Sequence, residues 1–157
     1  MLYDKKKMDE NFYMKFPSVL REALLSGDVA FDDMTQISFA SFKAYRGIFR
    51  KKDKPFIPLE RSDFDSQAEK SVRISDNERR RNRRRMSDGI GFYSCSVYKE
   101  LDEIRAALRF PQDDRRIAQV QVAEQDGCIR CSHETSHVDW WLYENTSSFW
   151  KDCTLVE

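Results

Sequence analysis

The chain of 157 residues holds 27 Lys and Arg and 27 Asp and Glu residues, so its formal net charge is zero. This length predicts one domain, and a hydrophobic content of 40% excludes a disordered chain. The net charge excludes a uniformly basic nucleic-acid-binding protein, and no apolar run approaches the roughly 18 residues of a membrane span. The stretch 1–16 mixes acids with bases and lacks the apolar core of a secretory signal, so we expect a cytoplasmic protein.

The first third of the chain predicts one helix and one strand. Apolar residues at spacings of three and four predict a helix over 11–26, although Pro17 inside the pattern fits only near a first turn. Aromatic and β-branched residues predict a strand over 42–46 that turns at Gly47. Two prolines within 51–58 indicate a loop.

The rest of the chain predicts short strands around one good helix. A short helix is expected within 62–74 and a strand over 92–96, followed by a helix over 97–110 with Ser96 as its N-cap. Further strands are predicted over 117–123, 128–131 and 138–143. This order predicts an α+β fold in a single domain, 1–157: an N-terminal helix plus a small mixed or antiparallel sheet, continuous or split, with one central helix.

Charge is unevenly distributed along the chain. Residues 73–85 hold seven arginines and two acids, a net charge of +5, whereas residues 98–157 carry a net charge of −5. We expect a flexible Arg-rich insertion near 73–88, which either pairs with the acidic half or binds the phosphates of a nucleic acid. The arginines concerned are Arg79, Arg80, Arg81, Arg83, Arg84 and Arg85.

Cysteine and histidine residues cluster late in the chain, where the spacing of Cys128, Cys131, His133 and His137 is close to that of zinc ligands. Zinc sites of this type have a long gap between their two ligand pairs, and here all four residues lie within ten positions. We therefore expect free thiols and no bound zinc.

Three kinds of polar residue stand at predicted strand ends. Arg46 precedes Gly47, so its guanidinium can point into a cleft, while Ser94 and Ser96 share one side of a strand that leads into a helix. A carboxylate later in the chain would complete a site. The candidates are Glu124, Glu134, Asp139 and Glu144.

This series resembles the pattern of the ADP-ribosyltransferases: Tyr-Arg-Gly at 45–47, Ser-Cys-Ser at 94–96, and a late acid. The resemblance implies an enzyme that uses NAD, either as an ADP-ribosyltransferase with a macromolecular target or as an NAD glycohydrolase. It also implies that Arg46 holds the phosphates of the dinucleotide and that the two serines support its nicotinamide-ribose side. Glu144 or Glu124 would stabilise the positive ribose that forms as nicotinamide leaves. A carboxylate beside a substrate held in place stabilises such a developing charge.

Several aromatic residues and one histidine complete the candidate site. Tyr45, Tyr93, Trp140 and Trp141 are candidates to sandwich a nicotinamide ring. His137 with Asp139 forms a possible acid/base pair on one strand face.

Two other interpretations stay open. Arg46 can instead serve only to pair with an acid such as Asp63 or Asp65. The whole protein can also be a non-enzymatic inhibitor or adaptor without a membrane partner, which uses its Arg-rich segment to contact nucleic acid or an acidic protein.

Overall fold

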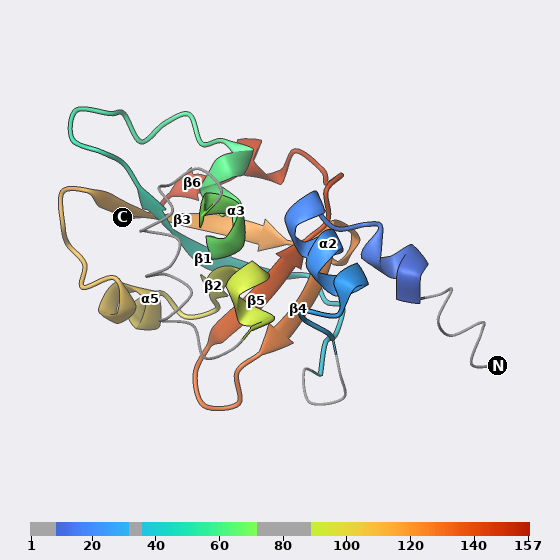
Figure 1. Ribbon diagram of the computed structural model, residues 1–157. Coiled ribbons are helices and arrows are strands. Elements are labelled where there is room, and N and C mark those ends of the chain that lie inside the picture. The colour runs from blue at the N-terminus through green and yellow to red at the C-terminus, as the bar shows by residue number, and fades with distance from the viewer. Residues whose placement is uncertain (1–8, 32–35, 72–88) are drawn as a thin grey trace.

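The computed structural model describes residues 9–31, 36–71 and 89–157, which fold around an antiparallel sheet of six strands (Figure 1). The strand order is β4-β5-β2-β1-β3-β6. The strands are β1 (Phe42–Phe49), β2 (Cys95–Tyr98), β3 (Arg115–Val122), β4 (Gly127–Cys131), β5 (His137–Leu142) and β6 (Thr154–Leu155). Besides the helical residues 9–13, the α-helices of the described residues are α2 (Ser18–Ser26), α3 (Gln67–Ser71) and α5 (Leu101–Ala107). Short 3₁₀ turns occur at Arg61–Phe64, Gly91–Tyr93, Glu124–Asp126 and Phe149–Lys151. The expected α+β fold is confirmed.

Strands β1 and β3 form the longest pairing in the sheet, and Ala44 lies opposite Val120 within it. The alternation predicted for β3 is observed, because Ala118, Val120 and Val122 are all buried. Val120 and Val122 belong to the main hydrophobic cluster, which also contains Trp140 of β5.

Consecutive tryptophans on β5 belong to different cores. Trp140 packs in the main cluster, where its ring lies 5.1 Å from that of Phe149. Trp141 packs in a second cluster with Phe16 and Leu20 from the N-terminal segment. Because neighbouring residues of a strand point to opposite faces, β5 is covered on both sides.

The N-terminal helical region consists of two parts rather than the predicted continuous helix. Residues 9–13 are helical, the chain then breaks, and α2 begins after Pro17, which is the N-cap residue. Proline fits this place because it has no N–H to donate into a preceding turn. Gly27 ends α2 in a left-handed conformation with φ 83°, which glycine adopts without steric cost.

Two predicted boundaries around β1 and α5 are wrong. Strand β1 does not turn at Gly47 but continues to Phe49, and a Cβ on Gly47 would lie 2.9 Å from Cδ1 of Leu108. The glycine therefore permits close packing of the segment after α5 against the strand. Ser96 lies within β2 and caps no helix, because α5 begins only at Leu101 with Glu100 as its N-cap.

None of the described helices is long and apolar enough to cross a membrane. The Arg-rich insertion expected near 73–88 lies outside the described residues.

Candidate functional site

Three polar residues form a direct row across neighbouring strands. Ser96 of β2 lies opposite Asp139 of β5, and Asp139 lies opposite Arg130 of β4. Directly opposed residues of antiparallel strands point to the same face of the sheet. This row therefore presents a hydroxyl, a carboxylate and a guanidinium side by side.

The carboxylate of Asp139 is held at both oxygens. Oδ2 accepts hydrogen bonds from Arg130, at 2.8 Å from Nε and 2.7 Å from Nη2. Oδ1 lies 2.9 Å from the hydroxyl oxygen of Ser94. Since the carboxylate is buried, these partners fix its position and compensate for lost water.

The hydroxyl of Ser94 has one proton and two acceptors in reach. Its Oγ lies 2.9 Å both from Oδ1 of Asp139 and from the carbonyl oxygen of Gly91. The Gly91 carbonyl also accepts the backbone N–H of Ser94, at 3.1 Å. A hydrogen bond to an ionised acceptor is the stronger one, so the Ser94 proton belongs on the bond to Asp139.

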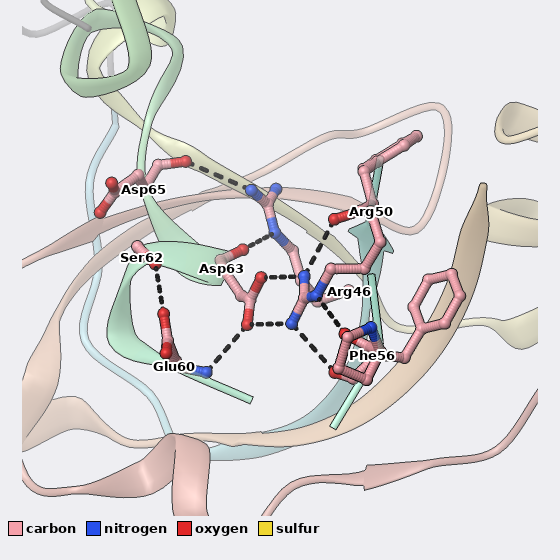
Figure 2. A network of polar contacts seen from close by, with 9 residues as sticks. Arg46, Arg50, Phe56, Glu60, Ser62, Asp63 and Asp65 are labelled. Carbon is pink, nitrogen blue, oxygen red and sulfur yellow. Dashed lines mark hydrogen bonds and ion pairs between the residues drawn. The ribbon is translucent and has the colours of Figure 1, made fainter. Parts of the chain in front are cut away.

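Arg46 of β1 is buried and donates hydrogen bonds to three backbone oxygens. It donates from Nε to Asp63 O at 3.1 Å, from Nη1 to Ser96 O at 2.9 Å and from Nη2 to Asp65 O at 3.2 Å. Figure 2 shows the bonds to the two aspartate residues. A guanidinium has five N–H donors, so two remain after these three bonds.

Arg46 does contact Asp63 and Asp65, the acids expected as its partners, but through their backbone oxygens and not through their carboxylates. Neither carboxylate makes an ion pair with Arg46, because Asp63 pairs with Arg50 and Asp65 pairs with Arg61. Within the described residues, the charge of Arg46 has no carboxylate at ion-pair distance. A buried cation in this situation favours an added anion.

A second cation lies close to Arg46. Burial, and then the positive charge of Arg46, lower the pKa of Lys70 on α3. The same positive charge opposes the effect of burial on the Cys95 thiol, whose pKa is nevertheless raised. The surroundings of Arg46 are thus positive enough to act on neighbouring groups.

Arg46 and the polar residues around Asp139 line one cavity of about 600 Å³. Pockets for small ligands typically measure roughly 300–1,000 Å³. The part of the wall near β1 and α3 contributes Arg46, Asp65 and Gln67. The remaining lining residues are Gln36, Gly91, Ser94, Ser96, Arg130, Cys131, Ser132, His133, His137 and Asp139.

Two histidines stand at this wall with different neighbours. The ring of His137 packs edge-on against that of Tyr98, with centroids 5.2 Å apart. Nε2 of His133 lies 3.3 Å from the side-chain oxygen of Gln36. Both are placed to contact a ligand with their remaining polar atoms.

Five of the residues singled out from the sequence for catalysis or NAD binding line this cavity: Arg46, Ser94, Ser96, His137 and Asp139. The other candidates lie outside its wall: Glu134 is exposed, and Trp140 and Trp141 are fully buried in the two hydrophobic clusters. Glu144 is exposed and lies 3.4 Å from Arg21, and Glu124 is exposed in the turn after β3. Tyr93 packs in the second hydrophobic cluster, and Tyr45 is half-buried opposite Tyr98.

The sequence patterns did not single out Arg130, although a signal for it exists. The strands over 128–131 and 138–143 are close enough in the chain to form a hairpin, and such a hairpin sets Arg130 near Asp139. Of the late carboxylates considered, Asp139 is the one in the cavity wall.

Comparisons with protein-family models, with curated proteins and with solved structures gave no match to this chain.

Proposed function

We propose that the protein is an enzyme that binds NAD in the cavity beside Arg46 and Asp139 and cleaves the bond between nicotinamide and ribose. It would transfer ADP-ribose to a macromolecule or to water, as the ADP-ribosyltransferase-like sequence pattern implies. One observation carries this proposal. Arg46, Ser94 and Ser96, which were chosen from separate sequence motifs, line one cavity together with a buried carboxylate.

The end of the cavity at Arg46 suits the anionic part of a dinucleotide. Arg46 is buried, lacks a carboxylate partner among the described residues and keeps two N–H donors. A pyrophosphate offers the oxygens that a guanidinium binds best. Lys70, whose pKa burial and Arg46 lower, adds to the attraction when it is protonated.

The end at Asp139 suits a sugar that becomes positive. When the glycosidic bond breaks, its electron pair leaves with nicotinamide and the ribose carbon becomes electron-deficient. A fixed carboxylate next to that carbon stabilises the developing charge without having to reorganise. Ser94 and Arg130 hold Asp139 in one place, and Ser96 presents a hydroxyl next to it. An oxygen of water or of the target then supplies the electron pair for the new bond and loses a proton.

In this proposal, Asp139 takes the role that the sequence pattern assigned to Glu144 or Glu124. Both glutamates are exposed and lie away from the cavity wall. His137 lies two residues before Asp139 on the same face of β5. It can contact the departing nicotinamide, or the water or target oxygen that replaces it.

The test uses the whole chain with NAD labelled on the adenylate part. We expect release of nicotinamide, with the label recovered as free ADP-ribose or on an added protein or nucleic acid. The proposal is wrong if calorimetry detects no binding of NAD at millimolar concentration and chromatography detects no nicotinamide above the protein-free control.

A further inference from the structure

A second surface, at the end of β1 three residues beyond Arg46, combines exposed bases with aromatic rings. It is formed where β1 ends and β3 begins, and consists of Phe49, Lys51, Lys52, Lys54, Phe56 and Arg116. We name it the basic strand end. We propose that it binds single-stranded nucleic acid, and this inference does not depend on the proposed enzymatic function.

The two loops that make this surface are held together. Phe49 lies opposite Arg115, and the N–H of Arg50 donates to Asp114 O at 3.0 Å. The guanidinium of Arg116 lies over the ring of Phe56, 4.6 Å from its centroid. In Figure 1 both loops extend from the same side of the sheet.

Arg50 organises the loop that carries the lysines. It donates to the carbonyl oxygens of Pro55 and Phe56, at 3.0 and 2.9 Å, and binds the carboxylate of Asp63 at 2.6 and 3.0 Å. Figure 2 shows Arg50 between Asp63 and Phe56. The loop is therefore ordered before a partner arrives, which reduces the entropy lost on binding.

The lysines on this ordered loop have no anionic partner within the described part of the chain. Lys51, Lys52 and Lys54 are exposed, and the acid among them is Asp53. The neighbouring acid Asp114 pairs with Arg115. The exposed acids Asp53 and Asp113 offset part of this charge, but the four bases Lys51, Lys52, Lys54 and Arg116 outnumber them. The surface therefore carries a net positive charge, which is the electrostatic requirement for binding a phosphate backbone.

The aromatic rings favour unpaired bases over other polyanions. Phe49 is 47% exposed, and Arg115 lies over its ring at 5.3 Å from the centroid. An exposed ring beside guanidinium and ammonium groups is the combination on which unpaired bases stack. Bases within a duplex are stacked on one another and cannot use such a ring.

The test measures fluorescence anisotropy of a labelled single-stranded oligonucleotide over a range of salt concentrations. Because the Arg79–Arg85 run can bind phosphate itself, its six arginines are first changed to Gln, and all variants are compared in that background. The test pair is Lys51→Ala with Lys52→Ala. The matched control is Lys43→Ala with Lys151→Ala, which also removes two exposed lysines.

We expect the test pair to reduce the slope of log affinity against log salt by about 1.4, since each lysine on a single strand contributes about 0.7. The control pair should leave the slope unchanged. Phe49→Ala should weaken binding about fivefold or more at constant salt, because base stacking is lost.

Four results would each overturn the proposal. They are no binding at low salt in the Gln background, equal slopes for the two lysine pairs, unchanged affinity in Phe49→Ala, or tighter binding of a duplex than of its single strand. Thermal unfolding of each variant shows whether the fold is intact.

Discussion

Nη1 of Arg46 donates a hydrogen bond to the carbonyl oxygen of Ser96, at 2.9 Å. Strands β1 and β2 are in register at Tyr45 and Tyr98, and Arg46 follows directly after that pair. The side chain of Arg46 thus connects β1 to β2 next to the backbone pairing of Tyr45 with Tyr98. Arg46 therefore contributes to the integrity of the sheet in addition to its place in the cavity wall.

Replacing Arg46 by Lys should destabilise the protein by about 1–3 kcal/mol. A single ammonium cannot reach the three carbonyl oxygens that the planar guanidinium satisfies at once, so buried acceptors lose their partners. Urea unfolding measures this change in the free energy of unfolding. An unchanged midpoint would show that these three bonds add nothing to stability.

Replacing Asp139 by Asn should reduce the rate of nicotinamide release about 100-fold or more if the proposed function is right. The amide keeps the shape, and its one oxygen can still accept from Arg130, but its NH2 group donates where Asp139 accepted from Ser94, and the negative charge is lost. Glu144→Gln, which changes an exposed carboxylate outside the cavity wall, is the control and should retain full activity. Equal losses in both variants, or none in Asp139→Asn, would contradict the assignment.

The two ion pairs near the basic strand end, Arg50 with Asp63 and Arg115 with Asp114, should differ in their contribution to stability. Asp63 is mostly buried and binds Arg50 and the N–H of Glu60, whereas Asp114 is 54% exposed beside Arg115. Asp63→Ala should cost about 2–4 kcal/mol, because it leaves buried donors unpaired. Asp114→Ala should cost clearly less, because water already screens the exposed pair with Arg115. Chemical denaturation of both variants makes the comparison, and the reverse order would refute it.

Gly127 tolerates no side chain, and the reason is steric. A Cβ at this position would lie 2.2 Å from the backbone oxygen of Trp141. Gly127→Ala should therefore cost about 3 kcal/mol or more, because the pairing of β4 with β5 must shift. Gly27→Ala, where φ is 83° and no atom lies within 4 Å, should cost only about 1 kcal/mol. Thermal unfolding of the two variants tests this order.

Cys128 should make stability fall at alkaline pH. Burial raises the pKa of its thiol to about 12. Above roughly pH 9 the unfolded chain loses this proton while the folded chain keeps it, so ionisation favours unfolding. The contribution is complete below the pKa of the unfolded chain and is lost as pH rises through the pKa of the folded state. The loss is on the order of 1 kcal/mol per pH unit.

Cys128→Ala tests this linkage directly. Its free energy of unfolding should be lower than that of the parent at pH 7, because a buried side chain is shortened. The difference between the two proteins should then shrink from pH 9 upward. A constant difference up to pH 11 would show that the thiol does not couple to folding.

Much of the sheet was predictable because strand alternation is a local signal. The buried residues of β3 and the aromatic β5 follow directly from the sequence. The start of α5 was not, because Ser96 is a good N-cap by residue type while its backbone is committed to pairing with β5. Long-range pairing overrode a local preference there.

The candidate site was partly predictable for the same reason. Arg46 and the two serines follow from strand patterns, but among the four late carboxylates the sequence pattern favoured Glu144 and Glu124 over Asp139. Only the register of β5 against β2 and β4 selects Asp139, and that register depends on contacts between distant segments. Tyr93 lies in a 3₁₀ turn rather than a strand, so alternation did not indicate its direction.

The adjacent tryptophans of β5 give the protein two optical probes on opposite sides of one strand. Trp141 lies among residues of the N-terminal segment, and Trp140 lies beside Phe149 near the C-terminus. If the N-terminal segment detached first during denaturation, the fluorescence of Trp141 would change before that of Trp140. Variants with one of the two replaced by Phe, and with Trp150 also replaced, would separate the signals. Coincident transitions would show that both layers unfold as one cooperative unit.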